Sequence, residues 1–317
     1  MAVLARAARP RLAVTLGDPR GIGPEIVAAA LVDPRVRAAC DLIVVGPGGA
    51  GVDADERVGK WRAGDGVAAA GALSGAAIER AVALAQSGAV QGIVTAPIDK
   101  AALLAGGYDF PGHTEMLAAL TGSRVSMMLA SDALRVVLAT THVALRDVPR
   151  LVTERAIVET ADITRRYLDA WFALSDARIA LCALNPHAGD GGRFGDEDGR
   201  VLAPAARAAG IAGPFPADTV FVRAMRGEFD AVIAPYHDVG MTAIKVASFG
   251  RAVNVTLGLP FPRTSPDHGT ALDIAGQGIA DAGSFVAATL ACSGIATRIA
   301  TRAMGRLLGA TGPVPTH

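Results

Sequence analysis

Short apolar runs alternate along the chain with longer helical stretches. Most of these runs are apolar at every position, as strands buried on both faces of a parallel sheet are. We predict strands at residues 12–16, 42–46, 92–96, 126–130, 135–141, 178–184, 230–234 and 252–258. Residues 67–88 and 153–174 predict helices, the first closed by Gly88 and the second begun by Thr153. The alternation predicts an open α/β sheet with helices on both faces, and residues 47–66 predict an irregular surface segment.

Composition narrows the class of protein. The chain has 317 residues, of which 51% are hydrophobic and 4% aromatic, so it can form two domains or one large α/β domain. Lys and Arg total 30 and Asp and Glu total 30, and this balance argues against a nucleic-acid or polybasic membrane binder. The N-terminal apolar stretch is interrupted by Arg6, Arg9, Pro10 and Arg11, which makes a poor signal peptide.

The cysteines and the hydropathy predict a location. Three cysteines at wide spacing, without a CxxC pair, suit a reducing compartment. No run of 18 apolar residues occurs, so we expect no membrane span. Together these features predict a soluble cytoplasmic protein.

Three of the six histidines share one context. His142, His187 and His237 each stand just past the C-terminal end of a predicted strand, which is the sheet edge where ligands bind in open α/β folds. Three neutral imidazoles that converge there would form a shell for a divalent metal. Alternatively, each histidine merely caps its strand or bonds a loop carbonyl. Asp218 and Asp238 could complete the shell or orient a ligand, or be ordinary loop residues.

Two glycine-containing stretches could approach a cofactor. LGDPRGIGPE (16–25) follows the first strand and places Pro24 at the start of a helix, but its G-x-G lacks the third glycine of a dinucleotide fingerprint and equally suits a tight turn. DHGTALDIAGQGIAD (267–281) places more residues that could contact a ligand at short spacing. They are His268, Gly269, Thr270, Asp273 and Gly276. Backbone amides there could meet a phosphate or an adenine. The alternative is a loop and a helix start with an acid in its first turn.

Other polar residues predict an anionic ligand. PGHTE (111–115) places His113 and Thr114 after a tight turn. Lys245 lies between apolar neighbours in AIKV, which suggests an anion partner or else a lysine that snorkels from a sheet edge. Asn254, inside a predicted strand, and Arg263 follow further along the chain.

The motifs in chain order resemble the 4-hydroxythreonine-4-phosphate dehydrogenase family of the vitamin B6 pathway. They are LGDPRGIGPE, TAPIDK (95–100), PGHTE, LATTH (138–142), LNPHAGDGG (184–192), PADT (216–219), YHDVG (236–240) and VNVTLGLPF–RTSPDHGTALDIAG (253–276). The resemblance as a whole runs from about residue 11 to residue 290. Two of them also resemble the isocitrate/isopropylmalate dehydrogenase superfamily. The resemblance therefore implies two α/β/α domains around a cleft, with residues 1–113 and 273–317 in one domain and residues 114–272, which carry the metal ligands and dimer contacts, in the other.

The resemblance also implies a role for each matching residue. The metal ligands, for one Zn, Co, Mg or Mn ion per subunit, would be His142, His187 and His237. The catalytic candidates would be Lys245, Asp238 and Asp218. The substrate contacts would be His113, Thr114, Lys245, Asn254 and Arg263. The cofactor loop would comprise His268, Gly269, Thr270, Asp273 and Gly276, and it would prefer NAD to NADP because the carboxylate of Asp273 repels a 2′-phosphate. The site would be shared between the two subunits of a homodimer.

The implied activity is metal-dependent oxidation of 4-phosphooxy-L-threonine by NAD or NADP. The product, a 2-amino-3-oxo acid phosphate, would decarboxylate to 3-amino-2-oxopropyl phosphate in pyridoxine 5′-phosphate biosynthesis. The chain departs from the family in a shorter segment after residue 46 and a short span between the His187 and His237 motifs. An alternative function is therefore that of a catabolic paralogue, which oxidises erythronate or threonate 4-phosphate. A metal-dependent hydrolase or a zinc-buffering protein is a further alternative, although neither would need an adenosine-type loop.

Overall fold

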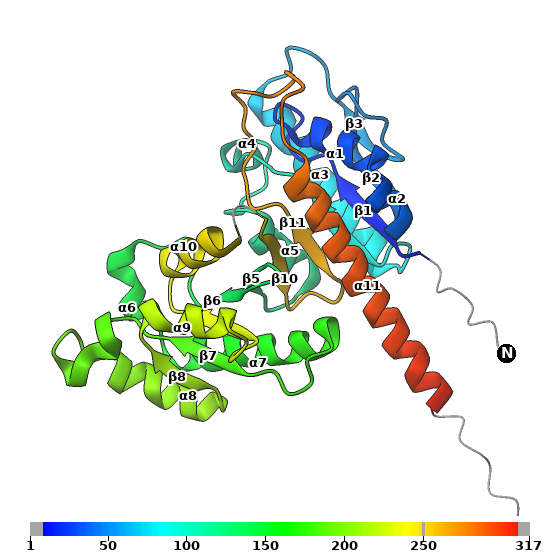
Figure 1. Ribbon diagram of the computed structural model, residues 1–317. Helices are drawn as coiled ribbons and strands as arrows, with labels where there is room; N and C mark the ends of the chain where they lie inside the picture. The colour runs from blue at the N-terminus through cyan, green and yellow to red at the C-terminus, as the bar shows by residue number, and fades with distance from the viewer. Residues whose placement is uncertain (1–8, 249–250, 310–317) are drawn as a thin grey trace, which may run out of the picture.

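The structure is a computed structural model that describes residues 9–248 and 251–309. The start of the N-terminal stretch, with Arg6, and the C-terminal His317 lie outside these ranges, as do the outer ends of the predicted first domain. One mixed sheet of 11 strands runs through the molecule in the order β3-β2-β1-β4-β11-β10-β5-β6-β9-β7-β8. Figure 1 shows the helices gathered around the two ends of this sheet as two lobes.

The strands are β1 (Arg11–Thr15), β2 (Asp41–Gly48), β3 (Glu56–Lys60), β4 (Gly92–Thr95), β5 (Ser126–Ala130), β6 (Arg135–Leu138), β7 (Ile179–Cys182), β8 (Ala212–Phe215), β9 (Ala231–Ala234), β10 (Val253–Leu257) and β11 (Arg263–Ser265). The α-helices are α1 (Gly23–Val32), α2 (Pro34–Ala39), α3 (Val67–Gln86), α4 (Lys100–Ala105), α5 (His113–Thr121), α6 (Val148–Leu151), α7 (Glu154–Phe172), α8 (Ala203–Ala209), α9 (Ala217–Met225), α10 (His237–Ser248) and α11 (Gly283–Gly309). Short turns of other helix types are η1 (Leu145–Asp147), η2 (Pro186–Gly192) and η3 (Asp198–Leu202).

The predicted strands and helices are all present. The α3 and α7 helices begin and end within two residues of their predicted bounds. The Thr153 side chain caps α7 by accepting a hydrogen bond from the Ala156 amide at 3.2 Å, and Pro24 lies in the first turn of α1. The α/β fold class predicted from the alternation is thus confirmed.

Three strands of the structure were not predicted from the sequence. β3 lies inside residues 47–66, which were expected to be irregular, and β8 and β11 were not expected. β3 and β8 are the two edge strands of the sheet. Neither contains a fully buried residue, and the sequence of β8 contains Gly and Pro, so neither shows a continuous apolar run.

The parallel pairing that the apolar runs indicate does not hold at the centre of the sheet. Two parallel blocks meet in an antiparallel seam, because β10 runs antiparallel to both β11 and β5, and β5 runs antiparallel to β6. A strand that is buried on both faces has the same apolar pattern in either direction, so hydropathy could not reveal this reversal. The seam joins the two lobes and forms the floor of the site described below.

Two helices are long and apolar enough to cross a membrane by length and composition alone. They are α3 and residues 283–305 of α11, and 50% and 44% of their most apolar windows are buried in the protein. The α3 helix packs on β1, β2 and α4, and α11 packs on β4, β10 and β11. This is the packing of helices that belong to a protein core, so the sheet beneath them accounts for their apolar residues.

Candidate active site

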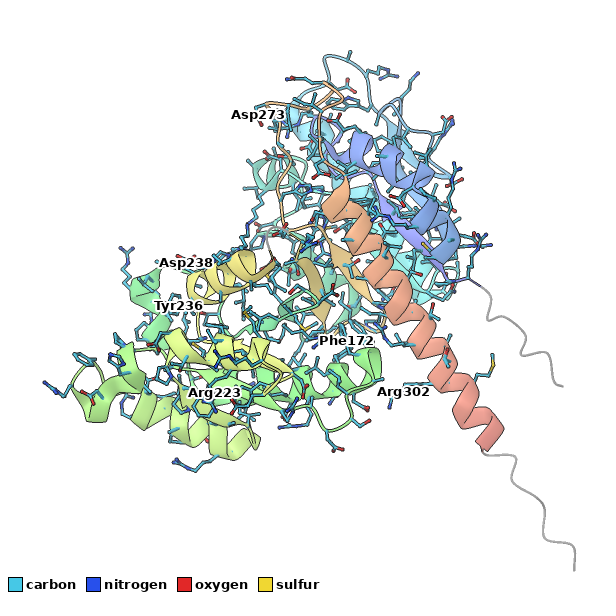
Figure 2. The ribbon with its side chains drawn as sticks, in the orientation of Figure 1. Phe172, Arg223, Tyr236, Asp238, Asp273 and Arg302 are labelled. Atoms are coloured by element: carbon cyan, nitrogen blue, oxygen red, sulfur yellow. The ribbon has the colours of Figure 1, made fainter. Side chains whose placement is uncertain are left out.

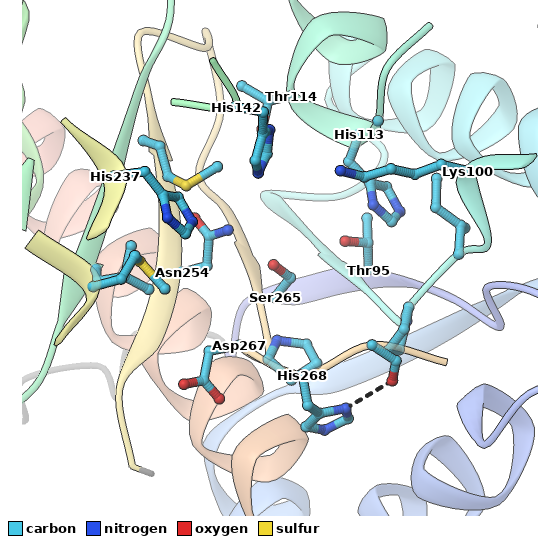
Figure 3. Close-up of a pocket in the computed structure, with 18 of the residues that line it drawn as sticks. Thr95, Lys100, His113, Thr114, His142, His237, Asn254, Ser265, Asp267 and His268 are labelled. Atoms are coloured by element: carbon cyan, nitrogen blue, oxygen red, sulfur yellow. Dashed lines mark hydrogen bonds between the residues drawn. The ribbon is translucent and has the colours of Figure 1, made fainter. Parts of the chain in front are cut away.

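A pocket of about 490 Å³ opens over the seam between the lobes (Figure 3). It brings together many of the residues that the sequence singled out, which are His113, Thr114, His142, His237, Lys245, Asn254, Arg263, His268 and Gly269. These come from α5, α10, β10, β11 and the loops after β6 and β11. The motifs are far apart in the chain, and the antiparallel seam is what makes them neighbours.

Arg263 is the buried cation of the pocket. Only 2% of it is exposed, and its guanidinium donates to the Thr256 and Thr95 hydroxyls at 3.0 and 2.5 Å. Burial lowers the pKa of Arg263 to about 10, so the side chain stays charged at neutral pH. Its Nε is buried without a hydrogen-bond partner. A buried charge without a counter-charge is costly, and an anionic ligand would compensate it.

His113 begins α5 and faces the same space. Its Nε2 is buried without a partner. Burial, with the charges of Arg263 and Lys100, holds the pKa of His113 well below its ordinary value of 6.5. The imidazole is therefore neutral at pH 7 and can donate or accept one hydrogen bond without adding charge.

This depressed pKa predicts how stability depends on pH. Between pH 6.5 and the lower pKa of folded His113, the unfolded chain binds a proton that the folded chain does not, so the free energy of unfolding should fall as the pH falls, by up to ~1.4 kcal/mol per pH unit from this group. Urea unfolding from pH 7.5 to 5 should show this slope. His113→Gln should flatten it, and an unchanged slope in that variant would remove His113 as the cause.

His142 and His237 lie together at the ends of adjacent parallel strands. Their ring centroids are 5.6 Å apart, and β6 pairs directly with β9. The Nδ1 of His237 contacts the Asp238 carboxylate at 2.7 Å. A carboxylate that accepts from Nδ1 leaves Nε2 facing outward as the ring nitrogen for a ligand. The structure therefore favours an orienting role for Asp238.

His187 does not join them in this chain. It is exposed in η2, with its ring 6.3 Å from that of Phe194, and it does not line the pocket. Among the residues that the structure describes, no group of three His, Cys, Asp or Glu side chains has metal-binding spacing. Within one protomer, therefore, His142 and His237 lie together and His187 lies apart from them.

The η2 loop has an unusual backbone that sets the position of His187. Residues 187–191 all have positive φ, from 43° to 83°, and three of them are not glycine. Such conformations cost about 1–3 kcal/mol each and persist only where the surroundings hold them. The buried Asp198 carboxylate holds the start of this loop by accepting from the Leu184 and Asn185 amides at 2.8 and 2.9 Å.

The three catalytic candidates differ in position. Lys245 is exposed on α10 and lines the pocket, so it lies on a helix and not on a sheet edge. Asp238 contacts His237 but is not among the residues that line the pocket, and Asp218, exposed in the first turn of α9, also lies outside the lining. Lys245 is thus the candidate in direct reach of a ligand in this pocket.

The predicted cofactor loop joins the first glycine-rich motif. The Ile22 amide donates to the Thr270 carbonyl at 2.9 Å, and the Gly278 amide donates to the Glu25 carboxylate at 3.0 Å. Gly21 is required here, because a Cβ at that position would lie 2.7 Å from the Thr270 carbonyl oxygen. The stretch is a loop until α11 begins at Gly283, so the alternative of an early helix start is wrong.

This loop borders a second hollow of about 380 Å³ that is lined by Arg20, Gly21, Glu25 and Gly276, among others. Asp273 is exposed on the loop in the upper lobe, far from Asp238 on α10 (Figure 2). His268 and Gly269 line the catalytic pocket instead. The loop therefore reaches from the pocket to the hollow.

Several pocket residues were not singled out from the sequence. They are Thr95, Lys100, Glu115, Ser265 and Asp267. Lys100 had a signal, since it ends the TAPIDK motif, and it faces His113 in Figure 3. None of Lys100, Lys245 and Arg263 lies within 4.0 Å of a carboxylate in the described parts of the chain. The pocket therefore carries unpaired positive charge.

The architecture and this pocket define the class: an α/β protein of two lobes on one mixed sheet, with a pocket between the lobes that suits an anionic small molecule. The chain belongs to the pyridoxal phosphate biosynthetic protein PdxA family, whose sequence profile matches residues 35–292. A 4-hydroxythreonine-4-phosphate dehydrogenase of Geobacter metallireducens is 43% identical over 345 residues, covering 97% of this chain and 99% of the relative. A D-threonate 4-phosphate dehydrogenase of Cupriavidus necator is 41% identical and covers 91% and 98%.

The fold agrees with these sequence relatives. The crystal structure of 4-hydroxythreonine-4-phosphate dehydrogenase from Klebsiella pneumoniae has a TM-score of 0.81 and 36% identity, covering 92% of this chain and 99% of that one. The family predicted from the motifs is thereby confirmed. The protein is an oxidoreductase for a phosphorylated small molecule, and its dehydrogenase relatives imply a nicotinamide cofactor. The hydrolase and zinc-buffering alternatives are replaced by this assignment.

Proposed function

We propose that the protein oxidises 4-phosphooxy-L-threonine in a metal-dependent reaction with NAD or NADP, and that the 2-amino-3-oxo product decarboxylates to 3-amino-2-oxopropyl phosphate for pyridoxine 5′-phosphate synthesis. The observation that carries this proposal is the buried Arg263, which lies without a counter-ion in a pocket that already holds Lys100 and Lys245. A substrate with both a phosphate and a carboxylate supplies the two anions that such a pocket needs. The names of the relatives at 43–45% identity support the choice of substrate.

The chain's own groups would bind and orient that substrate. Arg263 and Lys245 supply charge for phosphate and carboxylate, and neutral His113 with Thr114 supplies hydrogen bonds from the start of α5. Asn254 presents a buried Oδ1 without a partner, an acceptor available to a substrate donor. Lys245 is the catalytic candidate on the pocket wall, and it can take up the proton of the substrate alcohol only as a neutral amine. We therefore propose that it first loses its own proton and that Arg263 and Lys100 then hold the substrate anions.

The donor set fits a divalent metal in part. His142 and His237 offer two imidazole nitrogens at one edge, and imidazole suits Zn, Co and related ions. We propose that His187 completes the shell across a homodimer interface, since within one protomer it lies outside the pocket. When bound, the metal would stabilise negative charge on the substrate oxygen while the nicotinamide accepts a hydride.

The cofactor loop supports a preference for NAD, because the exposed Asp273 carboxylate would accept hydrogen bonds from ribose hydroxyls and repel a 2′-phosphate. Arg20 lines the neighbouring hollow, but its guanidinium donates to the buried Asp18 carboxylate at 2.6 Å. We expect kcat/KM to be higher with NAD than with NADP. Asp273→Ala should shift the ratio toward NADP, and equal use of both cofactors by the unaltered enzyme would show that Asp273 does not read the ribose.

Three broader proposals accompany this function. The chain would form a homodimer with shared active sites, it would act in the cytoplasm, and it would divide into domains at residues 113–114 and 272–273. The division places Arg263 and Lys245 in one domain and His113 in the other, so that the substrate would bridge the two. The exposed apolar side chains of Val143, Leu145 and Val246 near the His142 loop and α10 support a subunit contact on that side.

A catabolic role is the second candidate, because D-threonate 4-phosphate dehydrogenases are 41–43% identical to this chain. The two substrates share phosphate and carboxylate and differ at C2, which bears an amine or a hydroxyl. A panel of 4-phosphooxy-L-threonine, D-threonate 4-phosphate and D-erythronate 4-phosphate, followed by NADH absorbance, separates the two roles. We expect kcat/KM to be at least tenfold higher for the amino acid, and the reverse order would assign the catabolic role.

A further inference from the structure

A third space, larger than the catalytic pocket and distinct from the hollow beside the cofactor loop, lies on the opposite face of the seam. It has a volume of about 670 Å³, and we call it the back cavity. Alternate residues of β10 line the two spaces, because side chains of a strand point to opposite faces in turn. Asn254 faces the catalytic pocket, whereas Val253 and Val255 face the back cavity. The two spaces are therefore separate sites on either side of one strand.

Both lobes contribute to the back cavity. Phe172 at the end of α7 and Ser248 at the end of α10 come from the lobe that carries β6 and β9, and Ile295 and Arg298 come from α11. Figure 2 shows Phe172 beside α11, where the lobes meet. A ligand in this cavity would contact both lobes.

The walls carry three arginines and little compensating charge. Arg135, Arg251 and Arg298 line the cavity, and Asp132 is the acid among its described lining residues. None of the three arginines forms an ion pair within 4.0 Å with a described carboxylate. Their hydrogen bonds go to backbone carbonyls, from Arg135 to Asp230 at 3.2 Å and from Arg298 to Trp171 at 2.7 Å.

Two of these guanidiniums share one aromatic ring. The Cζ atoms of Arg135 and Arg298 lie 5.4 and 5.6 Å from the centroid of Phe172. Cation–π contact holds each side chain in place, but it also brings two like charges near each other. Burial and the charge of Arg135 both lower the pKa of Arg298. An anion between the two guanidiniums would relieve this repulsion.

Two buried polar atoms at the cavity lack partners. The Nε of Arg135 and the Oγ of Ser248 are both buried without a hydrogen bond. A buried donor that is left unpaired costs roughly 1–3 kcal/mol, and a bound oxyanion accepts from such donors. Beside them the floor is apolar, formed by Val253, Val255, Leu290 and Ile295.

From this arrangement we propose that the back cavity is a second ligand site, which binds a phosphate or carboxylate carried on an apolar or aromatic body. The arginines and Ser248 bind the anionic group, and the apolar floor and the Phe172 ring bind the body. Inorganic phosphate alone would bind only the arginines and Ser248. A neutral aromatic compound would contact only the apolar floor and the Phe172 ring.

Calorimetric titration with phenyl phosphate tests the proposal, with phenylacetate as the carboxylate arm and inorganic phosphate as the anion without a body. Lys245→Met weakens anion binding in the catalytic pocket and leaves the back cavity intact. Arg251→Met and Arg298→Met each remove one cation of the cavity while keeping an apolar stem. Arg207→Met, at an exposed position of α8, is the matched control for loss of one positive charge.

We expect phenyl phosphate to bind the unaltered protein, Lys245→Met and Arg207→Met, and to bind at least tenfold more weakly to Arg251→Met and Arg298→Met. It should also bind more tightly than inorganic phosphate in the Lys245→Met background. Because Arg251 is exposed and makes no ion pair with described residues, its variant keeps the test valid if Arg298→Met unfolds. Loss of all binding in Lys245→Met, undiminished binding in Arg251→Met, or no binding to the unaltered protein would overturn the proposal.

Discussion

His237→Ala is expected to abolish turnover at ordinary metal concentrations. The change removes one of the two imidazoles that lie 5.6 Å apart at the pocket, and a site that keeps only His142 from its own protomer would hold a divalent ion poorly. Metal content after dialysis and kcat measured together test this expectation. Asp238→Asn is the matched control, because it alters only the partner of Nδ1 and should weaken metal binding by about 10–100-fold without removing a ligand.

The same reasoning tests whether the site is shared between subunits. His187→Ala should lose metal and activity although His187 lies outside the pocket of its own protomer. If the ligands come from two subunits, mixing inactive His187→Ala with inactive His142→Ala should restore part of the activity through hybrid dimers with one intact site. Full metal content and full rate in His187→Ala would show that this histidine is not a ligand.

Arg263→Ala should lower kcat/KM by about 10–100-fold or more, since a charge-assisted contact contributes roughly 1.5–3 kcal/mol. Because the side chain is 2% exposed, its loss also leaves the Thr95 and Thr256 hydroxyls without their donor. These losses lower the free energy of unfolding, whereas removal of an uncompensated buried charge raises it, so the net change should be smaller than about 2 kcal/mol. Urea unfolding and steady-state kinetics measure the two effects separately.

Thr256→Val separates binding from folding at this position. It removes one hydrogen bond to Arg263 at 3.0 Å but keeps the guanidinium in the pocket. We expect it to lower stability with less than a tenfold effect on kcat/KM. An Arg263→Ala enzyme with unchanged kinetics on the phosphorylated substrate would remove Arg263 from the site.

The sequence predicts the buried strands well and the edge strands poorly. Residues 12–16 and 230–234 are apolar throughout because helices cover both sides of β1 and β9. β3 reads ERVGK and buries none of its residues fully, so its sequence carries no strand signal. Strand direction at the seam could not be predicted, because it depends on long-range pairing of β10 with β5 and β11, which no local pattern encodes.

The candidate site also has residues that the sequence predicts and residues that only the fold reveals. Positions just after strands pointed to His142 and His237, and strand pairing places them together. His187 stands just after β7 as predicted, but a run of positive φ angles turns its loop away, and spacing in the sequence does not reveal such a backbone. Lys100 begins α4 behind an Asp99 cap, so its local sequence looks like an ordinary helix start. Only the fold shows that it shares a pocket with Arg263.

The most direct test of the proposed reaction is to give the purified protein 4-phosphooxy-L-threonine and NAD with a divalent metal, and to follow NADH and carbon dioxide together. The account predicts that both form at equal rates, that a chelator stops both, and that 4-hydroxy-L-threonine without the phosphate reacts at least a hundredfold more slowly, because Arg263 and the lysines of the pocket lose their anion. Formation of NADH from the unphosphorylated compound at the same kcat/KM, or no NADH from the phosphorylated one with any divalent metal, would contradict it.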